Sequence, residues 1–212
     1  MYLQYSDEQT EYLKRRDPVL GAYIDSCGHI CRPADNDLFT SIVRQVAGQQ
    51  ISGAALQSVW AKIESRVGAV TPERICSGGT ETLRGCGLSE KKAKCISDIA
   101  ASISQGELEL KALEQMPDEE VIKVLTSFKG IGEWTAQMAL IFGLHRPDVI
   151  SFGDYGIRKG MQNLYGYDKI DRKTFETHAA VYSPYATTAS LYLWQAAKPA
   201  ADGQTGKAEL GG

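Results

Sequence analysis

Residues 125–136, LTSFKGIGEWTA, decide the fold of this chain. A helical pattern ends before Gly130 and Gly132, and a second helix is expected to begin directly after them. The two glycines allow a tight turn and leave room for a ligand to approach the backbone. The N–H groups that open the second helix form the positive end of its dipole, which favours a bound phosphate. Lys129 would add a positive charge. The alternative is an ordinary helix–helix connection with a glycine C-cap.

Helical periodicity extends over most of the remaining chain, and alternating strand patterns are nearly absent. We therefore predict an all-α protein. Asp37 is expected to cap one helix, and Thr71-Pro72 to open another. The predicted helical segments are 19–25, one from 38 to the glycine at 48, 54–67, one from 71, 91–104, one from 117, 134–142, 155–164 and 186–197.

The composition is that of an ordinary soluble globular protein, with 43% hydrophobic and 23% charged residues among 212. It excludes disordered, collagen-like and disulfide-scaffold classes. No apolar run approaches the roughly 18 residues of a membrane span, and the N-terminus is polar. We therefore expect a cytoplasmic location, nucleoid-associated in a bacterium, with the five cysteines as free thiols.

The net charge of −3 gives no support for a nucleic-acid partner by itself. The distribution of charge is uneven, however. Residues 123–160 contain five basic and three acidic side chains, whereas residues 1–25 contain three basic and five acidic ones. The average therefore conceals a more basic segment around the glycine turn, and DNA binding through this segment is not excluded.

Three further segments accompany the turn: GQQIS at 48–52, LRGCGLSEKKA at 83–93 and DVISFGDYGIR at 148–158. Together with residues 125–136, they resemble in content and order the helix-hairpin-helix DNA glycosylase superfamily with a Gly, Pro and Asp signature. The similarity is greatest to its alkylation-repair branch, the 3-methyladenine DNA glycosylase II type. It spans residues 37–194. Lys129 replaces a proline that many relatives have at this position, and lysine also suits a phosphate.

The resemblance implies two helical lobes that flank a cleft, without the N-terminal β domain of longer relatives. One lobe is expected to comprise residues 37–149, with the helix-hairpin-helix at 125–142. The second lobe is expected to comprise residues 1–36 plus 150–198 and to contribute the catalytic aspartate. Residues 199–212, rich in Gly and Ala, are expected to form a flexible tail.

By the same resemblance, Asp154 is the candidate catalytic residue. A carboxylate near C1′ of a deoxyribose would stabilise a cation-like sugar and orient or deprotonate the attacking water. The alternative role for Asp154 is the N-cap of the helix that begins at Tyr155, and the two roles are compatible. Asp148 is the nearest rival carboxylate, although its neighbours are typical of a loop.

The residue after the hairpin distinguishes two kinds of glycosylase. Relatives that also cleave the DNA strand have a lysine there, which forms a Schiff base with C1′. This chain has Trp134, which cannot. Trp134 and Trp194 are expected to sandwich a flipped base, and the indole face suits a cationic alkylated purine. Met138 is a further candidate for the base pocket. The alternative is that Trp134 and Met138 belong to the core.

The DNA contacts implied by the resemblance lie in the hairpin and in the 48–52 loop. Gln50, with Gln49 beside it, is the candidate wedge that fills the gap left by a flipped base; a helix cap or a buried amide is the alternative. The carbonyls of Thr126, Phe128 and Ile131 are expected to hold a structural Na⁺ or K⁺, with no required cofactor. The hairpin residues expected to bind DNA are Lys129, Gly130, Ile131, Gly132 and Thr135.

These expectations combine into a base-excision-repair enzyme that hydrolyses the N-glycosidic bond of alkylated purines such as 3-methyladenine. Its partner would be double-stranded DNA with damaged bases, with no membrane and no obligate protein partner, and it would lack lyase activity. Two alternatives remain open: the same fold acting on oxidised or deaminated bases, and a non-catalytic helix-hairpin-helix DNA-binding module. The carboxylate of Asp154 argues against the second, because binding alone gains nothing from an acidic group near phosphate.

Overall fold

The computed structural model describes residues 1–199, which contain twelve α-helices and no strand beyond an isolated bridge between Tyr2 and Pro33. This confirms the predicted all-α class. The first six helices are α1 (Asp7–Arg16), α2 (Pro18–Cys27), α3 (Leu38–Gly48), α4 (Gly53–Val67), α5 (Pro72–Gly85) and α6 (Glu90–Ser104). The others are α7 (Leu110–Gln115), α8 (Asp118–Thr126), α9 (Glu133–Phe142), α10 (Tyr155–Tyr165), α11 (Arg172–Tyr182) and α12 (Ala186–Ala196).

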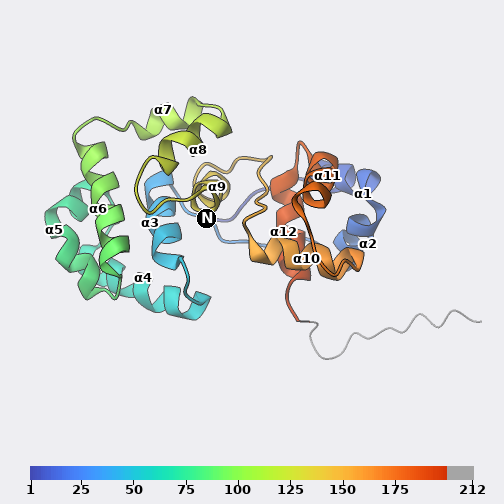
Figure 1. Ribbon diagram of the computed structural model, residues 1–212, viewed down its shortest axis with the longest axis horizontal. Helices are drawn as coiled ribbons and strands as arrows, with labels where there is room; N and C mark the ends of the chain where they lie inside the picture. Colours follow the sequence, from blue (N-terminus) through green and yellow to red (C-terminus); the bar gives the residue numbers. More distant parts are fainter. Residues whose placement is uncertain (200–212) are drawn as a thin grey trace, which may run out of the picture.

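The helices form two groups, which Figure 1 shows side by side. Helices α3 to α9 pack together around α3, which contacts α4, α6 and α9. Helices α1, α2, α10, α11 and α12 form the other group, in which α12 contacts all four of its neighbours. We call these groups the hairpin lobe and the terminal lobe. The N-terminal segment and residues 28–37 pass between them, so the terminal lobe contains both early and late parts of the chain.

Polar caps explain where several helices begin. The side chain of Asp37 accepts a hydrogen bond from Thr40 N (2.7 Å), and Thr71 accepts one from Arg74 N (3.4 Å), as predicted for α3 and α5. Asp154 caps α10 in the same way, through Ile157 N (2.9 Å). The N-cap therefore satisfies one of the N–H groups that a helix start leaves without a backbone partner.

Helices α1, α7 and α11 were not among the predicted segments, because their apolar pattern is weak. In α1 the buried residues are only Thr10 and Leu13, and in α11 only Phe175 and Tyr182. Helix α7 has six residues and one buried side chain. Most of the stability of such short amphipathic helices comes from tertiary packing, which a local pattern does not contain.

Two glycines bring α10 unusually close to α12. A Cβ at Gly160 would overlap with the backbone carbonyl of Leu193, and a Cβ at Gly156 would lie 2.9 Å from Cδ1 of Trp194. Only residues without a side chain fit this contact. The close packing carries the start of α10, and therefore Asp154, against the indole of Trp194.

No helix within residues 1–199 is both long and apolar enough to cross a bilayer. The predicted tail, apart from Pro199, lies outside the described residues.

Candidate active site at the junction of the lobes

The carboxylate of Asp154 lies where the two lobes meet, with 8% of the residue exposed. Oδ1 accepts hydrogen bonds from Ile157 N (2.9 Å) and from Nε1 of Trp194 (3.0 Å). Oδ2 accepts one from Nε1 of Trp134 (2.8 Å). Each oxygen therefore has an indole donor, and the hydrogen bonds that hold the carboxylate in one orientation all come from neutral groups.

The two tryptophans come from different lobes. Trp134 is in the first turn of α9, and Trp194 is near the end of α12. The structure thus brings together the three residues expected to perform and surround the chemistry. It adds a contact that the sequence did not predict, because the indole N–H groups point at the carboxylate. The tryptophans hold Asp154 in place in addition to any stacking on a base.

Trp194 has further neighbours that the sequence analysis missed. Its ring stacks on Phe142 (centroids 5.7 Å apart, planes at 23°), and the guanidinium carbon of Arg32 is 5.5 Å from each of the two rings. Arg32 and Phe142 also line an open cavity of about 410 Å³, whose wall includes Leu56 and Gln57 of α4. These contacts join segments that are far apart in the sequence, so only the tertiary structure could show that Arg32 and Phe142 adjoin Trp194.

Met138, the third residue predicted for the base pocket, is 2% exposed and belongs to the hydrophobic core. This placement favours the alternative interpretation of Met138 as a core side chain. Its position one turn after Trp134 put it on a plausible face, but α9 is buried along most of its length. A helix that is apolar on nearly every side does not reveal which face lines a site.

The glycine turn forms a hairpin between α8 and α9, as predicted. Lys129, Gly130 and Gly132 are exposed, and no side chain caps α9, so its first N–H groups are available to a ligand. Gly130 has a φ of +109°, a conformation that L side chains rarely adopt. A Cβ there would also lie 3.1 Å from Cys95 of α6. Both its backbone conformation and its packing therefore require glycine at position 130.

The 48–52 loop is attached to the hairpin through Gln49. Its Nε2 donates to Gly130 O (2.9 Å) and to Oγ1 of Thr135 (3.0 Å). The Thr135 residue is only 3% exposed, so its side chain faces Gln49 and does not reach a ligand outside the hairpin, contrary to prediction. The side chain of Gln49 likewise bonds to the hairpin, and its assistance to the wedge stays a prediction.

Gln50 differs sharply from its neighbour. It is exposed, and its φ of +56° lies in the left-handed region, which is uncommon for a residue other than glycine. Strained conformations of this kind concentrate at functional sites. Lys92 of α6 anchors the loop: its Nζ donates to Ala47 O (2.9 Å) and Gln49 O (2.6 Å). Lys92 thereby closes the end of α3, a role that the resemblance of residues 83–93 did not specify.

The chemistry of the hairpin backbone fits a monovalent cation. Carbonyl oxygens are the ligands expected for such an ion. Within residues 1–199, the carbonyls of Thr126 and Ile131 accept no backbone hydrogen bond, whereas Phe128 O already accepts one from Ile131 N (3.1 Å). Two of the three predicted ligands are thus fully available and the third in part. In the same range, no group of three or more His, Cys, Asp or Glu side chains is arranged to hold a metal.

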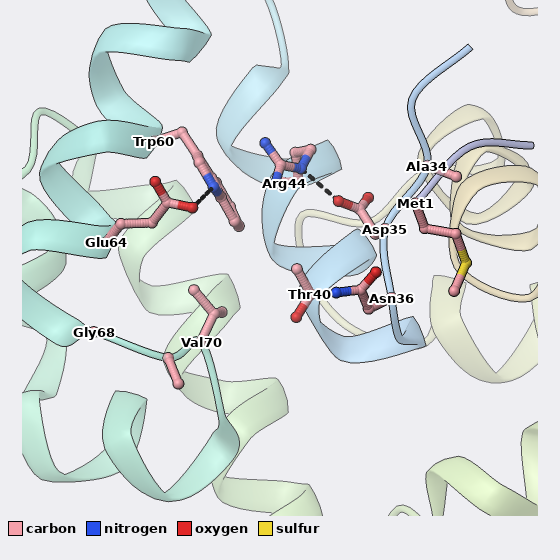
Figure 2. Close-up of a pocket in the computed structure, with 11 residues that line it drawn as sticks. Met1, Ala34, Asp35, Asn36, Thr40, Arg44, Trp60, Glu64, Gly68 and Val70 are labelled. Carbon is pink, nitrogen blue, oxygen red and sulfur yellow. Dashed lines mark hydrogen bonds and ion pairs between the residues drawn. The ribbon is translucent and has the colours of Figure 1, made fainter. Parts of the chain in front are cut away.

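A second cavity, of about 290 Å³, lies between α3 and α4 (Figure 2). Four of its polar side chains bond in two pairs: Arg44 Nε donates to Asp35 (2.6 Å), and Trp60 Nε1 donates to Glu64 (2.7 Å), as Figure 2 shows. The guanidinium of Arg44 also lies 3.7 Å from the Trp60 ring centroid. These contacts stabilise the joint between the N-terminal segment and the hairpin lobe, and they already supply partners to the side chains of the two pairs named above.

Comparison with known proteins gives a consistent result. Residues 43–184 match the family model described as HhH-GPD superfamily base excision DNA repair protein. DNA-3-methyladenine glycosylase 1 of Schizosaccharomyces pombe is 35% identical over 165 residues, which are 76% of this chain and 72% of that protein.

Two solved structures extend the likeness to the whole fold. The DNA-3-methyladenine glycosidase of Bacillus halodurans has a TM-score of 0.80 and 34% identity, and the match covers 93% of this chain and 92% of that one. The 3-methyladenine DNA glycosylase of Schizosaccharomyces pombe, in complex with abasic DNA, has a TM-score of 0.80 and 30% identity over 91% of this chain and 98% of that one. On the evidence of its hairpin, its aspartate and these matches, the chain belongs to the HhH-GPD superfamily of base excision DNA repair proteins.

Proposed function

We propose that this protein is a monofunctional DNA glycosylase that hydrolyses the N-glycosidic bond of alkylated purines in duplex DNA. The observation that carries the proposal is the carboxylate of Asp154, held by two indole N–H groups at the junction of the lobes. The names of the relatives point to the same reaction class.

The negative charge of Asp154 supplies the electrostatic part of the reaction. As the bond from C1′ to the base breaks, its electron pair leaves with the base, and positive charge develops on the sugar. A base that is already cationic through alkylation leaves as a neutral molecule. Water then bonds to C1′, and its proton passes to Asp154 and on to solvent. Because both carboxylate oxygens are held by hydrogen bonds, the charge does not need to reorient during the reaction.

Trp134 supports the absence of lyase activity in this proposal. Strand cleavage by the related bifunctional route requires a lysine amine to attack C1′, and an indole has no such nucleophile. At this position the indole N–H instead donates to Asp154. We therefore infer that the products are the free base and an intact abasic site.

The exposed hairpin and the 48–52 loop would hold the DNA. Gly130, Gly132 and the uncapped start of α9 offer backbone N–H groups to one phosphate, with Lys129 beside them. Gln50, exposed and already in the left-handed conformation, would enter the base stack. The bond from Gln49 to Gly130 O ties this wedge to the phosphate anchor, so that both contact the duplex as one unit.

Base release from methylated duplex DNA tests the proposal. Wild type should release methylated purines and leave abasic sites that alkali converts into strand breaks. Asp154→Asn should abolish release, and Asp148→Asn should not, because Asp148 bonds to Ser183 Oγ (2.6 Å) and Ala186 N (3.2 Å) at the start of α12. Absence of release by wild type, or full release by Asp154→Asn, would overturn it. Borohydride should trap no covalent protein–DNA adduct; a trapped adduct would contradict the monofunctional assignment.

A further inference from the structure

Arg32 places a positive charge inside the proposed site. Its guanidinium lies over Trp194 and Phe142, 5.5 Å from each ring centroid. The residue reaches solvent, but the surrounding protein still influences it: burial lowers its pKa, and the charge of Asp154 opposes this effect. A guanidinium stays protonated at neutral pH even so. Arg32 therefore brings a permanent cation close to both the stacking surface and the catalytic carboxylate.

The backbone keeps Arg32 at this place. Its carbonyl accepts a hydrogen bond from Leu3 N (2.9 Å), and three positions later Asp35 N donates to Phe142 O (3.0 Å). The segment is thus hydrogen-bonded to Leu3 of the N-terminal segment on one side and to the last residue of α9, Phe142, on the other. The backbone of residue 32 is therefore fixed beside the rings, and only the side chain is free to move.

We propose that Arg32 sets the charge selectivity of the base pocket by reducing the advantage that the indole faces and Asp154 give to cationic bases over neutral ones. The inference rests on the proposed function, since it concerns the base that this site would accept. Arg32 is not a catalytic residue in this proposal; it acts on substrate choice through its charge.

The physical basis is competition between two cations. A cationic base and the guanidinium are both attracted to indole and phenyl faces and to the Asp154 carboxylate. A neutral base that enters has to displace Arg32 from the rings but meets no repulsion from the displaced charge. A cationic base meets both costs, because like charges a few ångströms apart repel one another even where water partly screens them. Removal of the charge should therefore benefit cationic bases more than neutral ones.

Single-turnover base release provides the main measurement. Duplexes that contain 7-methylguanine, which is cationic, and hypoxanthine, which is neutral, would be compared in wild type, Arg32→Met and Arg32→Lys. Methionine retains length and an apolar contact with the rings, whereas lysine retains the charge. We expect the ratio of the cationic to the neutral rate constant to rise about tenfold in Arg32→Met and to stay within about twofold of wild type in Arg32→Lys.

Arg16→Met is the matched control. Arg16 also lies over an aromatic ring, Tyr12 (6.0 Å), but on α1, within the terminal lobe and away from Asp154. It should leave the ratio unchanged. An unchanged ratio in Arg32→Met would overturn the inference, whatever happens to the absolute rates. An equal rise in Arg32→Met and Arg32→Lys would also overturn it, because the effect would then come from shape.

A binding measurement separates this inference from the proposed function. Quenching of tryptophan fluorescence in the DNA-free protein would be titrated with 1-methyladenosine, a cation at pH 7, and with neutral adenosine. Arg32→Met should favour 1-methyladenosine over adenosine by about tenfold more than wild type does. If wild type released no base from either duplex, the proposed function would fail, while this titration would still decide the role of Arg32. An equal ratio of the affinities for 1-methyladenosine and adenosine in wild type and Arg32→Met would overturn the inference about Arg32 without affecting the proposed function.

Discussion

Asp154 and Asp17 have the same local structural role but different tertiary surroundings. Each caps a helix, each is almost buried (8% and 7% exposed), and each receives hydrogen bonds from side chains that bear rings. Asp17 accepts from Val19 N and Leu20 N (both 3.0 Å) at the start of α2, and from the hydroxyl of Tyr165 (2.6 Å). The N-cap role of an aspartate before a helix is a local feature, and the sequence indicates it equally well at positions 17 and 154.

The origin of the partners separates the two sites. The partners of Asp17 all belong to the terminal lobe, including His178, whose Nδ1 lies 3.7 Å from Oδ2. Asp154 takes one indole from each lobe and has a cation, Arg32, over the adjacent ring. A carboxylate enclosed within one lobe stabilises that lobe. A carboxylate at the junction of two lobes is accessible to a substrate that binds across both.

Replacement of each aspartate by asparagine is the strongest test of the functional difference between Asp154 and Asp17. Asp154→Asn should reduce base release by about 100-fold or more, because the charge that stabilises the cation-like sugar is lost. Asp17→Asn should leave the activity of the folded protein within about twofold of wild type, since Asp17 has no contact with the site. Single-turnover assays at low temperature, where both variants stay folded, provide the measurement. A comparable loss in both variants would mean that the two sites are not functionally distinct.

The indole donors allow a finer test of the junction. Trp134→Phe and Trp194→Phe each keep an aromatic face and remove the N–H that bonds to Asp154. Loss of one hydrogen bond to a charged group is worth about 1.5–3 kcal/mol, so single-turnover rates should fall by roughly 10- to 100-fold. Trp60→Phe is the control, because its indole bonds to Glu64 outside the site. Unchanged rates in both site variants would show that the indoles act by stacking alone.

Local signals in the sequence predicted the hairpin and most helix boundaries, whereas the resemblance to the glycosylase family pointed to Asp154, Trp134 and Trp194. A glycine turn, an N-cap aspartate and apolar spacing are all visible within a dozen residues. Position 134 is an example: a tryptophan where a lysine would serve a lyase is evident without coordinates. The resemblance to the family, not a local signal, pointed to Gln50, which the structure leaves exposed in a strained conformation.

The features of the site that the sequence did not predict depend on contacts between segments that are far apart in the chain. Arg32 reaches Trp194 across 162 positions of sequence, and Gln49 reaches Thr135 across 86. Neither contact follows from spacing on one helix. Side-chain direction was also beyond local reasoning, since Thr135 and Met138 are on the helix of the site and yet face the interior. The error in both cases was to assign a residue to the site from its neighbourhood alone.

We expect Asp17 to contribute more than Asp154 to the free energy of unfolding. Asp17→Asn removes charge-assisted bonds to Tyr165 and leaves buried groups with poorer partners, at a cost of about 1–3 kcal/mol in the free energy of unfolding. Asn still caps α2, so the helix itself should remain. Urea unfolding of Asp17→Asn, Asp154→Asn and wild type checks this. A smaller loss in Asp17→Asn than in Asp154→Asn would reverse the roles assigned here.

The smallest effect is the pH dependence of the Asp17 contribution. Burial raises the pKa of Asp17, but bonds to His178, Tyr165 and Leu20 N outweigh this, and the net shift is downward from 3.8. Burial also raises the pKa of Tyr165, so its hydroxyl remains a donor. Above the ordinary pKa the folded and unfolded carboxylates are both ionised, and the stabilisation is fully present. As the pH falls, the unfolded state takes up its proton first, so the stabilisation declines and is lost as the pH passes through the lowered native pKa. The unfolding free energies of wild type and Asp17→Asn should therefore converge below about pH 4. A difference that stayed constant from neutral pH to pH 3 would mean that the charge of Asp17 contributes nothing and that only the shape of the cap matters.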